Sequence, residues 1–409
     1  MRIVLDLQAC QTGSRFGGIG RYAMALTKAM IQNRGNHEFY VVLSNLFPGT
    51  VAAVRRELID LLPPDRIKVI YCVGSVVQAE ESNKIRYEVA ELIREAYIKE
   101  LEPDAILILS LFEGLYEETV TSLGRLTDKN RTAVILYDLI PLVEREKYLS
   151  ADFVYKWYRT KTAYLEQAGL ALAISQFSRE EGIELLNLAE DKVVNISSAI
   201  DEKFKPVKVS PEEASELRKK FGIRDRFLMF TGSFDQRKNQ EGLIRAFAAL
   251  PTDLRKQLQL VMVGKGWDAI YNHLHAIGES VGVKRQDIIF PGHISDLELL
   301  QLYNQCALFV FPSLREGFGL PVLEAMASGA TVIGSNTTSI PEVIGCKDAL
   351  FDPTNVDDIR DKIVECLTTP SFYAHLKDHN LKQAKNFSWH RSAVTAINAI
   401  EKLVKKETS

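Results

Sequence analysis

The sequence has few cysteines, no long apolar run and almost no net charge, and each shortage excludes a class of protein. Five cysteines are spread over 409 residues without a Cys-x-x-Cys pair, so we expect reduced thiols and neither a disulfide framework nor a cysteine zinc site. The longest apolar stretches, such as Ala307–Pro312, are far shorter than the roughly 20 residues of a membrane span. The 50 basic and 53 acidic side chains give a net charge of −3, whereas a nucleic-acid-binding protein is usually more basic.

Several catalytic motifs are missing as well. The sequence contains no Asp-x-Asp pair to hold a divalent metal against a diphosphate, and no GxxxxGK[ST], GxSxG or HExxH motif. The seven histidines form no cluster, so we expect no metal site. The opening MRIVLDLQAC has a strand pattern and lacks the basic start and long apolar run of a secretory signal. This predicts a cytoplasmic protein, unless a partner holds it at a membrane.

Short apolar runs alternate with longer segments of helical periodicity along the whole chain. The strand candidates are Arg2–Leu7, Glu38–Leu43, Ile67–Tyr71, Ala105–Leu109, Thr132–Tyr137, Leu170–Ile174, Val193–Ile196, Phe227–Thr231, Gln259–Val263, Asp287–Phe290, Ala307–Phe311 and Thr331–Gly334. Runs that are apolar almost throughout are typical of parallel strands buried on both faces. The alternation therefore predicts an α/β protein with two doubly wound domains. Since ligands bind at the carboxyl ends of such strands, we expect a central cleft lined by these ends.

The length also favours two domains, because 409 residues are too many for one compact core. The segment KFKPVKVSP, residues 203–211, carries two prolines and no periodicity, which is typical of a connection between domains. We therefore expect an N-terminal domain over residues 1–203 and a C-terminal domain over 204–385. Residues 386–409 are expected to form a helix that packs back toward the N-terminal domain.

The segment FPSLREGFGLPVLEAMASG, residues 311–329, joins a strand to a helix through a glycine-containing loop. Pro321 suits the first helical position and Gly329 suits the end of the helix, which would put Glu324 in the first turn. Backbone N–H groups of the loop beside a helix start are suited to phosphate oxygens. In the simpler interpretation, Glu324 favours the helix dipole and the glycines make a turn. Glu316 argues against it, because a carboxylate beside an anion site needs a role of its own.

The segment FLMFTGSFDQRKNQEG, residues 227–242, places Arg237 and Lys238 in a polar loop directly after a buried strand. Two cations at the end of a parallel strand suit a diphosphate, since Arg can bind two oxygens and Lys adds a point charge. A pair of this kind is also common as a solvated surface feature. Its place at the same sheet edge as the previous segment favours the diphosphate.

Two further glycine groups follow apolar strands. Gly17, Gly18 and Gly20 precede a helix, and Gly264 and Gly266 lie in the segment VMVGKGW. The spacing GGIG differs from the dinucleotide fingerprint, and no acidic residue ends the second strand to bind an adenine ribose. A close approach of backbone to a ligand is the expected use of both groups.

Taken together, these segments resemble a known enzyme family. EGFGLPVLE, with Glu316 and Glu324 eight positions apart, resembles the E-x7-E signature of retaining GT-B glycosyltransferases of family 4. Other segments that resemble the family are GGIGRY at 17–22, ISQFSRE at 174–180, GSFDQRKN at 232–239, FPGHISDLELLQLYNQC at 290–306 and SIPEVIGCKDALFDP at 339–353. The nearest subgroup is that of bacterial mannosyl- and rhamnosyltransferases of O-antigen or exopolysaccharide assembly.

The resemblance implies the GT-B fold, in which two Rossmann-like domains face a central cleft, and a role for each matching residue. Arg237 and Lys238 would hold the donor diphosphate, Glu324 the ribose hydroxyls, and the backbone of 292–294 the base. Glu316 would bind the transferred sugar. The implied donor-binding set is Gly17, Gly18, Ser233, Arg237, Lys238, Gly264, Gly266, His293, Ile294, Glu316, Gly317, Phe318, Gly319, Leu320 and Glu324. The implied catalytic set is Glu316, Asp138, Arg237 and Lys238.

The chain departs from the family pattern at two places. It has Tyr137-Asp138 where relatives often have His-Asp, so a histidine contact to the sugar is lost or replaced. It has Gly232-Ser233 where many relatives have Gly-Arg, which leaves fewer cations for the diphosphate.

The expected activity is transfer of a hexose, first of all mannose from GDP-mannose, to a hydroxyl of a lipid-linked polysaccharide, with retention and without a metal cofactor. UDP- and dTDP-sugars stay open as donors. The expected partners are the nucleotide sugar and the glycan acceptor, without nucleic acid and with peripheral attachment to the inner face of the membrane as an option. Two other hypotheses are a sugar-nucleotide 2-epimerase and a non-catalytic nucleotide-sugar-binding subunit.

Overall fold

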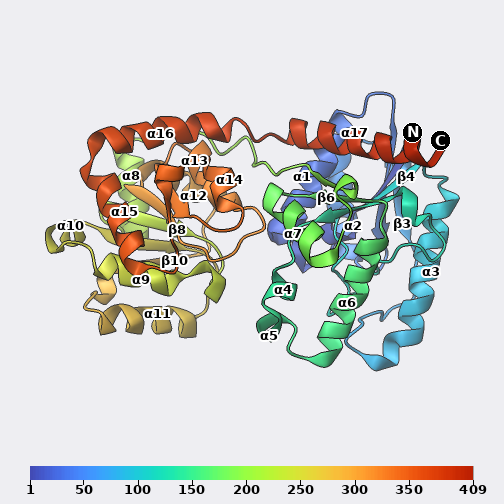
Figure 1. Cartoon of the computed structure of the whole chain (residues 1–409), viewed down its shortest axis with the longest axis horizontal. Helices are drawn as coiled ribbons and strands as arrows, with labels where there is room; N and C mark the ends of the chain where they lie inside the picture. The colour runs from blue at the N-terminus through green and yellow to red at the C-terminus, as the bar shows by residue number, and fades with distance from the viewer. Residues whose placement is uncertain (409) are drawn as a thin grey trace. The chain divides into compact units, whose positions relative to one another are not determined.

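Two parallel sheets, one of seven strands and one of six, organise residues 1–408, which are the residues that the structure describes (Figure 1). The structure is a computed structural model, and its contacts divide the chain into two units. Unit 1 comprises Met1–Ser198 and the C-terminal segment that begins at Ser388, and unit 2 comprises Ala199–Phe387. Two doubly wound α/β units were expected from the alternation of apolar runs and helical segments, and the fold class is confirmed.

The sheet of unit 1 has the spatial order β3-β2-β1-β4-β5-β6-β7, and its neighbouring strands are parallel. Its strands are β1 (Arg2–Asp6), β2 (Glu38–Ser44), β3 (Ile67–Ile70), β4 (Ala105–Ile108), β5 (Thr132–Leu136), β6 (Leu170–Ala173) and β7 (Val193–Asn195). Val4, Val42, Ile108 and Val134 lie on four neighbouring strands and are buried in one core cluster. Burying side chains of this size stabilises the fold by about 1.5–3 kcal/mol each, which explains why the strands are apolar throughout.

Unit 1 contains the helices that connect its strands and, in addition, the C-terminal helix. They are α1 (Gly18–Gln32), α2 (Pro48–Leu58), α3 (Lys84–Glu100), α4 (Ile140–Val143), α5 (Arg145–Tyr148), α6 (Asp152–Gln167), α7 (Gln176–Leu186) and α17 (Trp389–Thr408). In Figure 1, α17, drawn in red, lies beside α1 although the two are far apart in the sequence. The rings of Tyr22 on α1 and Trp389 on α17 are 5.0 Å apart and edge to face. The side chains of His37 and Glu401 approach to 3.0 Å and form a hydrogen bond.

The sheet of unit 2 has the order β10-β9-β8-β11-β12-β13 and is also parallel. Its strands are β8 (Phe227–Thr231), β9 (Gln259–Val263), β10 (Ile288–Gly292), β11 (Leu308–Phe311), β12 (Val332–Ser335) and β13 (Leu350–Phe351). The edge strand β13 was not expected from the sequence, because two residues are too few to show a periodicity.

The helices of unit 2 begin with clear sequence signals. They are α8 (Pro211–Phe221), α9 (Gln240–Ala248), α10 (Thr252–Lys256), α11 (Asp268–Ser280), α12 (Asp296–Gln305), α13 (Leu320–Ala327), α14 (Ile340–Ile344), α15 (Val356–Thr368) and α16 (Pro370–Ala384). Ser210 and Ser295 each form a capping box with the glutamate three positions later, at the starts of α8 and α12. Such caps satisfy backbone N–H groups that otherwise lack partners.

The division between the units differs slightly from the predicted boundaries of 203 and 385. Residues 199–207 belong to unit 2, where the N–H of Val207 donates to the side chain of Asn304 at 2.9 Å. At the other end, unit 2 continues to Phe387, whose ring packs edge to face on that of Phe318 at 5.6 Å. These contacts are long-range, so the sequence gives no local sign of them. In the part of the chain that is described, no helix is both long enough and apolar enough to cross a membrane.

Candidate functional site

Three predicted residues of unit 2 form one ionic cluster. A short 3-10 helix after β8 carries Arg237 and Lys238, and the loop after β11 carries Glu316. Lys238 Nζ lies 2.5 Å from Glu316 Oε1, and Arg237 Nη1 lies 3.1 Å from Glu316 Oε2. Because β8 and β11 are neighbours in a parallel sheet, both loops leave the same edge. The N–H of Leu314 also donates to the carbonyl of Arg237 at 2.7 Å, which ties the two loops together.

Hydroxyl groups that the sequence did not single out hold the Glu316 loop. Ser313 Oγ donates to Glu316 Oε1 at 2.6 Å, and the N–H of Glu316 donates to Thr338 Oγ1 at 3.1 Å. Ser339 Oγ donates to the carbonyls of Glu316 and Phe318 at 3.1 and 2.8 Å. Ser313 lies two residues after the end of the buried strand β11, and this position was the one signal for it in the sequence. Thr338 and Ser339 come from the loop after β12 and are recognisable only in three dimensions.

Lys238 and Glu316 are buried, whereas Arg237 is partly exposed, and burial and charge have opposite effects on the buried carboxylate. Only 6% of Lys238 and 7% of Glu316 are exposed. Burial lowers the pKa of Lys238, and Arg237 lowers it further against the attraction of Glu316. Burial alone would raise the pKa of Glu316, but Lys238 and Arg237 outweigh it and the pKa lies below its ordinary value. The carboxylate is therefore ionised at neutral pH and is paired with both cations.

The glycine-containing loop leads into α13 at an unusual backbone conformation. Gly319 is the N-cap with φ +103°, and a Cβ there would lie 2.6 Å from Ile340 Cδ1, so both backbone angle and space require glycine. The helix begins at Leu320, one position before Pro321, so Pro321 is its second residue. The expectation that Glu324 lies in the first turn is therefore wrong: the first turn holds no acidic residue, because the chain enters the helix earlier than proline alone suggests.

Glu324 has a buried tyrosine as a partner. Tyr303 OH, on α12, donates to Glu324 Oε2 at 3.1 Å. Thr231 Oγ1, at the end of β8, lies 2.9 Å from the same tyrosine oxygen. The sequence analysis singled out neither Tyr303 nor Thr231 as a site residue.

The other residues of unit 2 that were predicted to bind the nucleotide-sugar donor lie at the carboxyl ends of neighbouring strands. Gly264 follows β9, and a Cβ there would lie 2.0 Å from the carbonyl oxygen of Gly232, so the two turns touch through backbone. The N–H of Gly266 donates to Tyr271 OH at 2.9 Å. Ser233 accepts a bond from Gln240 Nε2 through its carbonyl at 2.7 Å. His293 and Ile294 connect β10 to α12, with Gly292 at φ +76°.

Gly17, Gly18 and Asp138 belong to unit 1, where they lie at the carboxyl end of that unit's own sheet. Gly17 is the N-cap of α1, so its neighbouring N–H groups point along the helix start. Asp138 accepts the N–H of Ile140 at 3.1 Å. Tyr137, which replaces the histidine of many relatives, donates to the carbonyl of Leu109 at 2.8 Å. The tyrosine thus has a structural partner within unit 1.

Glu113 is a buried carboxyl of unit 1 that the sequence analysis missed. It is 3% exposed in the loop after β4 and accepts bonds from Ser110 Oγ at 2.9 Å and Ser14 Oγ at 3.4 Å. Burial, and next the neighbouring Glu117, raise its pKa to about 8. Glu113 is therefore largely protonated at neutral pH.

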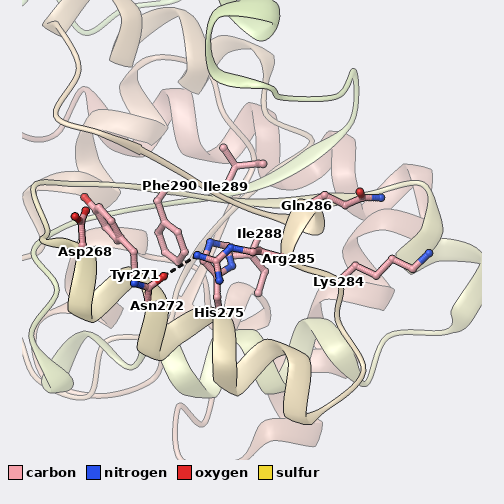
Figure 2. Close-up of a pocket in the computed structure, with 10 residues that line it drawn as sticks. All are labelled: Asp268, Tyr271, Asn272, His275, Lys284, Arg285, Gln286, Ile288, Ile289 and Phe290. Carbon is pink, nitrogen blue, oxygen red and sulfur yellow. Dashed lines mark hydrogen bonds between the residues drawn. The ribbon is translucent and has the colours of Figure 1, made fainter.

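A pocket of about 700 Å³ lies between α11 and the edge strand β10. Figure 2 shows its lining residues, which are Asp268, Tyr271, Asn272, His275, Lys284, Arg285, Gln286, Ile288, Ile289 and Phe290. The rings of Tyr271 and Phe290 stack at 4.8 Å, and Arg285 donates to Asn272 at 2.7 Å. The aromatic side of the pocket fixes Tyr271, which in turn bonds Gly264 and Gly266. None of the predicted site residues is among those lining it.

Among the described residues, no group of three or more His, Cys, Asp or Glu side chains is arranged to hold a metal ion.

Comparisons with known proteins give a consistent result. Residues 213–384 match the family model described as glycosyl transferases group 1. The serotype-specific mannosyltransferase WbdA of Escherichia coli is 37% identical over 405 residues, which cover 99% of this chain and 48% of that protein. The O-antigen chain mannosyltransferase B of E. coli is 33% identical over 275 residues, covering 66% of this chain and 70% of its own length. The chain thus spans about half the length of WbdA.

Among solved structures, Anabaena HepE in complex with UDP and glucose superposes with a TM-score of 0.67 at 18% identity. The superposition covers 100% of this chain and 99% of HepE. At this identity the likeness shows the fold alone.

Proposed function

The chain belongs to the group 1 glycosyl transferases, and from that membership we propose that it transfers mannose from GDP-mannose to a hydroxyl of a growing lipid-linked polysaccharide such as O-antigen. The reaction proceeds with retention at the anomeric carbon. The names of the two E. coli relatives support the sugar and the class of acceptor. The complex of HepE with UDP and glucose supports a nucleoside diphosphate as the leaving group.

The observation that carries the proposal is the ionic cluster of Arg237 with the buried Lys238 and Glu316, beside the start of α13. Arg237 and Lys238 are balanced by Glu316 and by Asp235, which lies 3.9 Å from Arg237 Nε. A net positive potential comes from the backbone N–H groups at the start of α13, because the first turn of a helix attracts anions. This arrangement suits a diphosphate better than a neutral ligand.

The leaving group sets the main electrostatic demand of the reaction. As the bond to the sugar breaks, negative charge accumulates on the diphosphate and positive charge on the anomeric carbon. Lys238 and Arg237 accelerate the reaction only if they bind the departing diphosphate more strongly than the bound donor. Their pairing with Glu316 holds both side chains in place before the donor arrives, so little reorganisation is needed.

Glu316 orients the transferred sugar in this mechanism and does not attack it. The β-phosphate oxygen takes the proton of the acceptor hydroxyl on the face from which it departs, and the acceptor oxygen forms the new bond on that same face. Gly17, Gly18 and Asp138, which belong to unit 1, stay predicted site residues. The cations supply the charge that a divalent metal supplies in enzymes with an Asp-x-Asp motif, so we propose that no metal cofactor takes part. Peripheral attachment at the inner face of the membrane would bring the enzyme to a lipid-linked acceptor.

The direct test is to incubate the purified chain with GDP-mannose, UDP-hexoses and dTDP-sugars, with and without a mannose-terminated acceptor oligosaccharide. The proposal expects an acceptor extended by an α-linked mannose with GDP-mannose, identified by mass and by NMR of the new linkage. Transfer from a UDP- or dTDP-sugar instead would correct the donor. An epimerised donor without transfer, or binding without turnover, would contradict the proposal.

A further inference from the structure

Three side chains from three elements form a hydrogen-bonded chain in the interior of unit 2. Thr231 ends β8, Tyr303 lies on α12 and Glu324 lies on α13. The oxygen of Tyr303 is 2.9 Å from Thr231 Oγ1 and 3.1 Å from Glu324 Oε2. Tyr303 is completely buried, whereas Glu324 is only partly buried. A ligand can therefore reach Glu324 but not the tyrosine behind it.

The direction of both hydrogen bonds follows from the chemistry of the groups. Burial, and next the charge of Glu324, raise the pKa of Tyr303 well above its ordinary value, so the phenol keeps its proton. A carboxylate only accepts hydrogen bonds, so this single proton points to Glu324. The Thr231 hydroxyl must then donate to the tyrosine oxygen. One oxygen of the carboxylate is thus held by a donor that is itself fixed from β8.

We infer that Tyr303 is a positioning residue that orients the carboxylate of Glu324 toward the ribose hydroxyls of the donor, and that this chain prefers ribonucleotides over deoxyribonucleotides through that bond. The inference rests on the proposed function, which assigns the ribose to Glu324. When the hydrogen bond from Tyr303 is lost, this oxygen of Glu324 is held less firmly, and the ribose hydroxyls meet a less well ordered carboxylate. A fixed carboxylate meets both hydroxyls at once, and its hydrogen bonds to them are of the stronger, charge-assisted kind.

The test measures dissociation constants of GDP and of 2′,3′-dideoxy-GDP by calorimetry, for the parent chain and for Tyr303→Phe. Hydrogen bonds to a charged group imply a preference for GDP of about 10- to 100-fold in the parent. In Tyr303→Phe we expect this preference to fall by about 5- to 10-fold, with the dissociation constant of dideoxy-GDP almost unchanged. A general loss of packing would weaken the binding of both nucleotides by the same factor. The ratio of the two dissociation constants therefore distinguishes a positioning role of Tyr303 from a structural one.

Tyr22→Phe is the matched control. It removes another buried tyrosine hydroxyl, which donates to the carbonyl of Ser197 at 2.9 Å in unit 1, and should leave the preference as in the parent. In a Glu324→Gln background, Tyr303→Phe should have no further effect on the preference, because the two residues act as one unit. Thr231→Val keeps the shape of the threonine and should lower the preference in the same direction, by a smaller factor.

A parent that prefers GDP while Tyr303→Phe and Thr231→Val keep the full preference overturns the inference and leaves the proposed function intact. A parent that transfers mannose but binds both nucleotides equally overturns it as well. A parent that binds neither nucleotide and transfers nothing contradicts the proposed function instead. If Tyr303→Phe fails to fold, the ratio of the dissociation constants of GDP and dideoxy-GDP is measured for Thr231→Val alone. A lowered preference for GDP then supports the inference, and a full preference overturns it.

Discussion

Lys238 and Glu316 form an ion pair of 2.5 Å although they lie 78 positions apart in the sequence. They come from the loops after two adjacent parallel strands, and each is more than nine-tenths buried. A buried pair of charges contributes little net stability while both partners are present, but removing one partner leaves an uncompensated charge in the interior. Substitution of either residue is therefore expected to lower both the stability of the fold and the activity.

Lys238→Met should destabilise the protein by about 3–5 kcal/mol, because it leaves the Glu316 carboxylate with one cation in place of two. Urea denaturation followed by circular dichroism measures this. The double variant with Glu316→Gln removes both charges and should recover a large part of the loss. A single variant as stable as the parent would show that the pair is not formed in solution.

Glu316→Gln should lower kcat by about 10²-fold or more, since the amide no longer pairs with the two cations or orients the sugar. No glycosyl–enzyme adduct should accumulate in the parent or in the variant. Intact-protein mass spectrometry during turnover tests this, with the exposed Glu241→Gln as the control for a mere loss of charge. A peptide containing position 316 with the added mass of a hexose would mean that Glu316 is the nucleophile.

Gly319→Ala should be destabilising by about 1–3 kcal/mol, because the backbone lies at φ +103° and the new methyl group would meet Ile340 Cδ1 at 2.6 Å. The start of α13, which we propose binds the donor phosphate, would shift with it, so the KM for the donor should also rise. Gly49→Ala is the matched control, since a Cβ there meets no atom within 4 Å. Equal effects of the two substitutions on thermal unfolding would contradict this account of the loop.

The pH dependence of stability should show the influence of Glu113. Its pKa is about 8 in the folded chain, against an ordinary value of 4.5. Between these two values the unfolded chain loses a proton that the folded chain keeps, so this residue makes stability fall as pH rises. Glu113→Gln cannot ionise, and its free energy of unfolding relative to the parent should increase from pH 5 to pH 8 and then level off. A constant difference across this range would show that Glu113 ionises normally in the fold.

The fold was predictable because its signals are local. A strand such as Phe227–Thr231 is apolar at every position, as burial on both faces requires, and a capping box such as that of Ser295 marks a helix start within four residues. The strand β13 has only two residues, which are too few to show a strand pattern in the sequence. The exact start of α13 depends on Gly319, where the positive φ and the nearness of Ile340 leave no room for a Cβ.

The candidate site was predictable where its chemistry is carried by charge next to a strand end, as for Arg237, Lys238 and Glu316. The residues that hold these groups could not be found in this way. Ser339 reaches the Glu316 loop from another strand, and Tyr303 looks like any aromatic core residue until its hydroxyl is seen beside Glu324. Supporting residues such as Ser339 and Tyr303 are identified only by their tertiary contacts. The charged residues of the cluster can be picked out in the sequence by their residue type and their position after a strand. The roles of the predicted residues in binding and catalysis stay predictions.

The central claim is that paired basic side chains and a helix start stabilise the departing diphosphate without a metal. The most direct measurement is the rate of mannose transfer from GDP-mannose in the presence of excess EDTA, for the parent and for folded Lys238→Glu. The account predicts that the parent keeps its rate in EDTA and that the variant loses it by about 10²-fold or more. A parent that turns over only when magnesium or manganese is added, or a variant as fast as the parent, would contradict it.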